Sequence, residues 1–176
     1  MIFVVRAICL LIYFSVCSCV GSQNRQERVN SELPVEISIQ MNKRLVEEEQ
    51  KIIEKYVKDN NLEMNRTETG LWYKISEEGD GEKIETGKIV SLNYSVRLIN
   101  ETLLYTSEEL GHKEFLVGQG GVETGLEEAV LMLKNGCKAK LIIPSHLAHG
   151  ILGDDNKIPS RAILLYDVEV VEVKRK

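Results

Sequence analysis

The chain has 176 residues, which is enough for one domain of ordinary size with a tail but not for two full domains. Hydrophobic residues make up 43% and charged residues 28%, a balance typical of globular proteins rather than of disordered or fibrous ones. The net charge is −5 and no long run of Lys or Arg is present, which argues against nucleic acid as a partner because phosphate binding needs clustered cations.

An apolar run opens the chain over residues 1–16, and only Arg6 interrupts it with a charge. The run has the length of a signal peptide and is shorter than the roughly 20 residues of a membrane-spanning helix. It ends in Val16-Cys17-Ser18-Cys19, which resembles a bacterial lipobox in which a small residue precedes the lipidated cysteine. Cys19 fits that position better than Cys17, because the residue before Cys17 is a valine.

We therefore predict a lipoprotein signal peptide over residues 1–18 and a lipid on Cys19, the first residue of the mature chain. The mostly polar residues 19–33 are predicted to form a flexible tether. A lipid anchor of this kind holds a protein at a membrane surface without spanning the bilayer. The alternative is a plain secretory signal that is cleaved near Ser18 or Gly21.

Three of the four cysteines lie in the apolar leader or, as Cys19, directly at its end, so Cys137 is the one cysteine left in the body of the chain. A disulfide framework and a Cys-x-x-Cys zinc or redox pair are therefore excluded in the body. Cys137 begins a predicted strand, and we expect it to be a small core hydrophobe rather than a reactive thiol.

Residues 34–66 are predicted to form a helical extension. Pro34 opens a short extended stretch, and a helix then follows from about residue 41 to residue 58. Its apolar face is predicted from the spacing of Met41, Leu45, Ile52 and Tyr56, with Val46, Ile53 and Val57 beside them. Charged residues fill the other face, so this amphipathic helix is expected to pack on the following domain or to pair with a partner helix.

From Thr67 onward, apolar and polar residues alternate with a period of two, which is typical of antiparallel strands with one buried face. The clearest run is 90–98, in which every second residue is apolar. Further strands are predicted around residues 71–76, 138–143 and 162–170. Gly79-Asp80-Gly81 is predicted to form a turn between the first two strands.

One short helix interrupts the strands. Thr124-Gly125-Leu126-Glu127 matches a capping box, in which the threonine and glutamate side chains bond the first backbone N–H groups of a helix. The apolar stripe of this helix is predicted to consist of Leu126, Ala129, Val130 and Leu133. The sequence therefore predicts an α+β fold, a twisted antiparallel sheet wrapped around one short helix, with the amphipathic helix N-terminal to it. A shallow apolar pocket is expected where the sheet and the short helix meet.

Several segments, taken in order, resemble the signatures of the FKBP-type peptidyl-prolyl isomerases over about residues 68–174. They are Gly79–Gly81, Val90–Ser95, Phe115–Gly118, Val122–Val130, Ala148–Gly150, Ile158–Pro159 and Leu165–Glu169. The lipobox, the 41–58 helix and Tyr105–Gly111 look closer still to the FKBP-type lipoproteins of Bacteroidetes, including the gliding-motility-associated branch. The resemblance implies an FKBP-like domain over residues 67–176.

The resemblance also implies a binding pocket with assigned residues. The catalytic residues would be Tyr105, Phe115, His149 and Tyr166, three aromatic walls and a histidine that donates a hydrogen bond to a bound carbonyl. The substrate-binding residues would be Tyr94, Thr106, Val122, Glu123, Leu126 and Ile158. Three positions depart from the family pattern, since Thr106 stands for Asp, Leu126 for Trp and His149 for Tyr. Judged without the resemblance, the apolar members of this set would be assigned to the core.

The implied activity is peptidyl-prolyl cis-trans isomerisation that assists the folding of secreted or envelope proteins. Rotation about the bond before proline costs about 18–20 kcal/mol, and a pocket that binds the twisted amide better than the planar one lowers this barrier without any cofactor. The expected partners are prolyl-containing polypeptides, a membrane reached through the lipid anchor, and an envelope protein. The expected location is the cell envelope, on a membrane and facing the periplasm. The alternative function is a low-activity, lipid-anchored chaperone or protein-binding module of an envelope or motility machine.

A metal site is the remaining hypothesis, suggested by His146 and His149 with Asp154 and Asp155 nearby. The spacing differs from that of a helical His-Glu-x-x-His zinc site, and the segment is predicted to be a loop. We therefore expect no metal.

Overall fold

The computed structural model describes residues 35–175, so the predicted signal peptide, the lipidated Cys19 and the tether lie outside the described residues. The helices are α2 (Val35–Asp59), α3 (Ser107–Leu110), α4 (Thr124–Val130) and a short 3-10 helix, η1 (Ser145–Leu147). The strands are β1 (Asn65–Arg66), β2 (Trp72–Glu77), β3 (Lys88–Leu98), β4 (Leu103–Thr106), β5 (Lys113–Leu116), β6 (Lys138–Ile143) and β7 (Leu164–Arg175).

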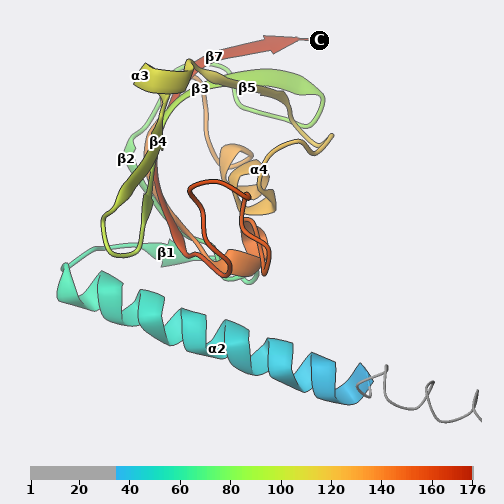
Figure 1. Ribbon diagram of the computed structural model, residues 1–176. Helices are drawn as coiled ribbons and strands as arrows, with labels where there is room; N and C mark the ends of the chain where they lie inside the picture. Colours follow the sequence, from blue (N-terminus) through green and yellow to red (C-terminus); the bar gives the residue numbers. More distant parts are fainter. Residues whose placement is uncertain (1–34, 176) are drawn as a thin grey trace, which may run out of the picture. The chain divides into compact units, whose positions relative to one another are not determined.

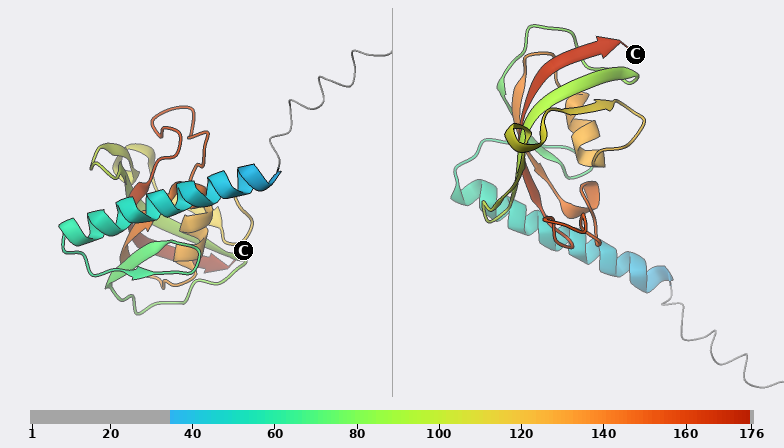
Figure 2. Two further views of the ribbon diagram at one scale, coloured as in Figure 1. Left: turned by 90° about the horizontal axis from the view of Figure 1, so that it is seen from below. Right: turned by 45° about the horizontal axis from the view of Figure 1, so that its top comes forward.

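The strands form one antiparallel sheet in the order β1-β2-β6-β7-β3-β4. Its centre is β3, which pairs with β7 from Lys88 opposite Arg175 to Leu98 opposite Leu164. The other edge of β3 is shared, because β5 pairs with one half of the strand and β4 with the other. The sheet curves around α4 (Figure 1), and the second view in Figure 2 shows β3 and β7 side by side with α4 on the concave side. The predicted α+β fold is confirmed.

The main core lies between the concave face of the sheet and α4. Val90, Leu92 and Val96 point inward from β3 and are at most 1% exposed. Leu126 and Val130 of α4 meet them and are fully buried. Burying each such side chain contributes about 1.5–3 kcal/mol, so the predicted apolar stripes account for much of the stability of this layer.

The predicted capping box at α4 is wrong by one residue. The carbonyl of Glu123 accepts from the N–H groups of Leu126 and Glu127, at 2.9 and 3.0 Å, so Glu123 and not Thr124 is the N-cap. The Glu127 carboxylate accepts from the Gly120 N–H at 3.0 Å instead of reaching back to the cap. The turn starts one residue early and directs the Glu123 side chain into the protein, where it meets the groups described below.

Helix α2 is longer than the sequence predicts, because it begins at Val35 and includes the stretch that was predicted to be extended. Its buried face also differs from the predicted one. Ile53 is fully buried, whereas Met41 and Ile52 are 48% and 49% exposed. Within residues 35–175, no helix combines the length and the apolarity needed to cross a membrane.

Ile53 belongs to a second apolar cluster on the other face of the sheet, together with Ile142 of β6, Leu165 of β7 and Ile163, which directly precedes β7. Ile142 and Leu165 pair with one another and point away from the main core, because neighbouring residues of a strand face opposite sides. The helical turn around Ile53 therefore covers outward-facing apolar side chains that would otherwise meet water. The sheet itself starts before residue 67, since β1 pairs with β2.

Candidate active site

A pocket of about 200 Å³ opens beside the concave face of the sheet. Strands β3, β4, β5 and β7, helix α3, the N-cap of α4 and the loop after η1 all contribute to it. Its lining consists of Tyr94, Val96, Tyr105, Leu110, Lys113, Glu123, His149, Asp154, Ile158 and Tyr166.

Six of the ten residues that the resemblance assigned to the site line this pocket: Tyr94, Tyr105, Glu123, His149, Ile158 and Tyr166. They come from positions 94 to 166 of the chain, so the fold brings distant segments together. The other four, which are Thr106, Phe115, Val122 and Leu126, lie elsewhere.

Phe115 lies in the main core at 8% exposure, opposite Val90 in the ladder between β5 and β3. Lys113, two residues earlier on β5, lies opposite Leu92 and lines the pocket instead. The two side chains share one face of β5, because residues two apart in a strand point the same way. The resemblance assigns Phe115 to the pocket, whereas the residue of this face of β5 that lines the pocket in the structure is Lys113.

Local structure also explains why Thr106, Val122 and Leu126 do not line the pocket. Thr106 caps α3 by accepting from the Glu109 N–H at 3.2 Å, and it lines a groove on the outer face of the sheet. Leu126 is fully buried under α4, and Val122 packs against the same core.

The Glu123 carboxylate is the electrostatic centre of the pocket, and its side chain is only 6% exposed. The Tyr166 hydroxyl donates to Oε1 at 2.5 Å, and Nε2 of His149 lies 3.1 Å from the same oxygen. The Lys113 ammonium lies 3.4 Å from Oε2. That ammonium is also 5.3 Å from the ring centre of Tyr94 and 5.8 Å from that of Tyr166, within the range of cation–π attraction.

Burial opposes the ionisation of Glu123, but Lys113, the Tyr166 hydroxyl, its own backbone N–H and His149 together lower its pKa below the ordinary carboxyl value. The same arrangement raises the pKa of the buried Tyr166 hydroxyl well above its usual range, through burial and the adjacent carboxylate. An ionised carboxylate can only accept, so His149 donates to Glu123 through Nε2. In the neutral ring Nδ1 is an acceptor, and it becomes a donor in the imidazolium form.

A second network fixes the rim of the pocket. The Tyr105 hydroxyl of β4 donates to the Asp154 carboxylate, which raises the pKa of Tyr105. Oδ1 of Asp154 accepts from the backbone N–H groups of Ile158 and Asn156, at 2.7 and 2.9 Å. Lys157 lies across the Tyr105 ring, with its ammonium 5.1 Å from the ring centre. The loop that carries Ile158 is thereby tied to the aromatic wall on β4.

Four lining residues were absent from the predicted site: Val96, Leu110, Lys113 and Asp154. Val96 could have been found, because it follows Tyr94 by two residues on the inward face of β3. Asp154 was considered only as a metal ligand. The position of Lys113 had no signal in the sequence, because a lysine in a short alternating strand is usually solvent-exposed.

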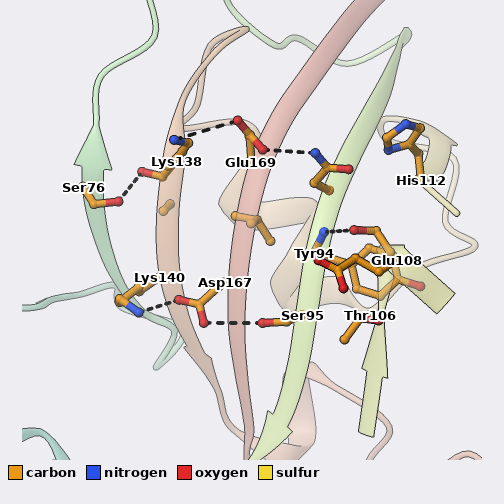
Figure 3. A pocket seen from close by; sticks show the side chains of 14 residues that line it. Ser76, Tyr94, Ser95, Thr106, Glu108, His112, Lys138, Lys140, Asp167 and Glu169 are labelled. Carbon is orange, nitrogen blue, oxygen red and sulfur yellow. Dashed lines mark hydrogen bonds and ion pairs between the residues drawn. The ribbon is translucent and has the colours of Figure 1, made fainter. Parts of the chain in front are cut away.

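A larger groove of about 740 Å³ crosses the outer face of the sheet, over β2, β6, β7 and β3 (Figure 3). Its charged side chains pair across the strands, with Lys140 at 2.6 Å from Asp167 and Lys138 at 4.0 Å from Glu169. Asn93 donates to Glu169 at 3.0 Å. These groups pair with one another on an exposed surface, so the smaller pocket, with its buried carboxylate and tyrosine rings, is the stronger candidate for chemistry.

Among residues 35–175, no group of three or more His, Cys, Asp and Glu side chains could hold a metal ion. Nε2 of His146 lies 3.1 Å from the carbonyl of Thr69. Cys137 is buried, and its sulfur accepts from the Gly79 N–H at 3.1 Å.

The family model for FKBP-type peptidyl-prolyl cis-trans isomerases matches residues 80–171. The chain is 35% identical over 112 residues to the FKBP-type peptidyl-prolyl cis-trans isomerase FkpA of Buchnera aphidicola subsp. Schizaphis graminum, covering 63% of this chain and 44% of that one. It is 35% identical over 123 residues to a probable FkpA of Neisseria meningitidis serogroup B, covering 68% of this chain and 44% of that one. The chain thus spans less than half the length of these two curated relatives.

Among solved structures, the crystal structure of FkpA from Escherichia coli is similar, with a TM-score of 0.65 and 28% identity over 97% of this chain and 81% of that chain. The crystal structure of AtFKBP13 is also similar, with a TM-score of 0.60 and 27% identity over 62% of this chain and 98% of that chain. Fold, pocket and family match agree, and the chain belongs to the FKBP-type peptidyl-prolyl cis-trans isomerase family.

Proposed function

We propose that this chain is a peptidyl-prolyl cis-trans isomerase and that the pocket beside α4 binds the twisted X-Pro amide. The observation that carries the proposal is the convergence of three tyrosine rings, from Tyr94, Tyr105 and Tyr166, around a small pocket in a domain of this family. The reaction needs neither a nucleophile nor a metal, because the barrier arises from lost amide resonance. A site that binds the twisted amide more tightly than the planar one therefore suffices.

The proposed roles follow from the geometry. The rings of Tyr94, Tyr105 and Tyr166 with the Ile158 side chain form walls around the proline ring. His149 donates to Glu123 through Nε2, so its proposed hydrogen bond to the carbonyl of the twisted amide would come from a protonated Nδ1. The backbone N–H of Glu123 is the second proposed donor, and to act as one it would exchange its bond to the Glu123 carboxylate for one to the substrate carbonyl.

One observation favours the second candidate function, a binding or chaperone module with little turnover. The pocket contains an ionised carboxylate and an ammonium, Glu123 and Lys113, 3.4 Å apart. Charges strengthen the binding of a planar, strongly dipolar amide as well as of a twisted one, and uniform binding gives affinity without acceleration. Peptide binding without acceleration would therefore identify such a module.

The cis-trans exchange of a prolyl peptide, followed by NMR without a coupling protease, tests the proposal. The full-length chain should accelerate the exchange, and Tyr105→Ala should remove most of the acceleration. Ser95→Ala is the matched control, because Ser95 lies on β3 between Tyr94 and Val96 but lines the outer groove. Exchange at the uncatalysed rate with a folded chain would refute the isomerase, and equal losses in both variants would refute the location.

We further propose that the protein is a lipoprotein of the cell envelope, anchored through Cys19 and facing the periplasm, where it assists secreted or envelope chains. The support is the apolar leader that ends in Val16-Cys17-Ser18-Cys19. The likeness of the leader, of the 41–58 segment and of Tyr105–Gly111 to Bacteroidetes FKBP-type lipoproteins supports a place in that group, including a role beside an envelope or motility machine.

A further inference from the structure

The segment from Ser145 to Arg161 supplies three of the pocket's lining residues, His149, Asp154 and Ile158. The two ends of this segment are joined by hydrogen bonds among Ser145, Gly150 and Arg161, which we call the neck of the segment. The Gly150 N–H donates to the Ser145 carbonyl at 2.8 Å, and the Arg161 N–H donates to the Gly150 carbonyl at 2.8 Å. The neck therefore determines where His149, the neighbour of Gly150, stands in the pocket.

A residue outside the family-matched region holds this neck. Glu49, on α2, has a side chain that is only 6% exposed. Its Oε2 accepts from the Ser145 N–H at 3.0 Å and its Oε1 from the Ser145 hydroxyl at 2.7 Å. Oε1 also lies 3.5 Å from the Arg161 guanidinium. The Glu49 carboxylate thus contacts both the first and the last residue of the segment, so it links the two ends of the neck to each other.

Two features suggest that the contacts of Glu49 with Ser145 and Arg161 do more than dock α2. A buried carboxylate is costly unless it is fully bonded, and an apolar side chain would dock a helix more simply. In addition, Arg161 has a φ of +57°, a left-handed conformation that is unfavourable for a residue with a side chain. The bonds from Arg161 to Gly150 and to Glu49 hold that conformation in place.

The neighbouring residue on α2 provides a contrast. Gln50 is also buried, but its Nε2 donates to the Gly70 carbonyl at 3.1 Å and its Oε1 accepts from the Trp72 indole at 3.1 Å. Gln50 therefore docks the same helical turn onto the segment around β2, whereas Glu49 docks it onto the pocket segment.

We propose that Glu49 is a positioning residue of the pocket, through which α2 sets the placement of His149 and of the 150–161 loop. The proposal rests on the proposed function for its effect on catalysis, but the placement of the loop can be measured independently. Losing Glu49 should let the neck open, and misplacing a group by about 1 Å can cost up to about a hundredfold in rate.

The test compares Glu49→Ala, Glu49→Gln and Gln50→Ala in the full-length chain, at a temperature at which circular dichroism shows each variant to be folded. Glu49→Ala should speed amide hydrogen exchange at Gly150 and Arg161 by about tenfold or more, with exchange in β3 and β7 unchanged. It should also lower kcat/KM for a prolyl peptide by about ten- to a hundredfold. Glu49→Gln keeps an acceptor for Ser145 and should recover part of both effects, while Gln50→Ala should leave both within about twofold.

Two results would overturn the proposal. One is a folded Glu49→Ala chain whose amide exchange at Gly150 and Arg161 stays within about twofold of the parent. The other is an equal effect in Gln50→Ala, which would indicate a general role in helix docking. If Glu49→Ala does not fold, Ser145→Ala, which removes the 2.7 Å bond, should show the same loop-specific change to a smaller extent. A parent chain without isomerase activity would refute the proposed function, whereas the exchange at Gly150 and Arg161 would still decide the role of Glu49.

Discussion

Replacing Glu123 by glutamine tests the electrostatic account of the pocket. Glu123→Gln keeps the volume of the side chain but removes the charge that Tyr166, His149 and Lys113 surround. A hydrogen bond to a charged group contributes about 1.5–3 kcal/mol and a neutral one about 0.5–1.5 kcal/mol. With the bonds from Tyr166 and His149 both weakened in this way, the free energy of unfolding should fall by about 2–3 kcal/mol at neutral pH.

The effect should depend on pH with a defined sign. Burial raises the pKa of Glu123, but Lys113, Tyr166 and His149 lower it further, so the folded-state value lies below the unfolded one. The carboxylate therefore contributes stability above the unfolded pKa of about 4.3, and this contribution is lost as the pH falls through the folded-state pKa. Urea unfolding of both chains between neutral and strongly acidic pH measures the difference. A difference below about 0.5 kcal/mol at pH 7, or one that stays constant into acid, would refute the reasoning.

Three further changes have defined outcomes. Phe115→Ala should cost about 3–5 kcal/mol of stability but leave kcat/KM of the folded fraction unchanged, since the ring lies in the core; loss of activity in a folded chain would make it a pocket wall. Cys19→Ser should abolish incorporation of labelled palmitate in the native host. Labelling that persists in this variant, or that is lost on replacing Cys17 instead, would refute the assignment of the lipid to Cys19. A chain that begins at Arg66 should still unfold cooperatively but less stably, because it lacks Ile53 and the rest of α2; an unfolded chain would make the helix integral to the core.

Much of the fold could be predicted because the alternation of apolar and polar residues shows which face of each strand enters the main core. In β3 the inward residues Val90, Leu92 and Val96 were identifiable from their period of two. The second cluster was harder to predict, since Ile142 and Leu165 break the alternation by being apolar on the outward face. Such outward-facing apolar residues indicate that a further element covers the sheet there. The turn of α2 that covers it could not be oriented, because Ile52 and Ile53 are equally apolar neighbours on the helix.

The pocket could be predicted only in part, for a geometric reason. Period two gives the face of a strand but not the position along it, so the alternation could not tell which residue of the face that Phe115 and Lys113 share lines the pocket. The sequence did not indicate that the Glu123 carboxylate lies in the pocket, since the capping-box pattern placed the N-cap at Thr124 and gave the Glu123 side chain no role. Contacts between segments that are far apart in sequence, such as that of Glu49 with Ser145, produce no periodic pattern in the sequence and could not be predicted from it.

The most direct test of the central claim is to map a bound prolyl peptide on the folded chain by amide chemical shifts, which needs no turnover. The account predicts saturable shifts at Val96, Tyr105 and the 148–158 loop, with Ser76 and Lys140 of the outer groove unaffected. Saturable shifts confined to the outer groove, or none at either place, would contradict the claim that the pocket beside α4 is the site at which this protein binds its substrate.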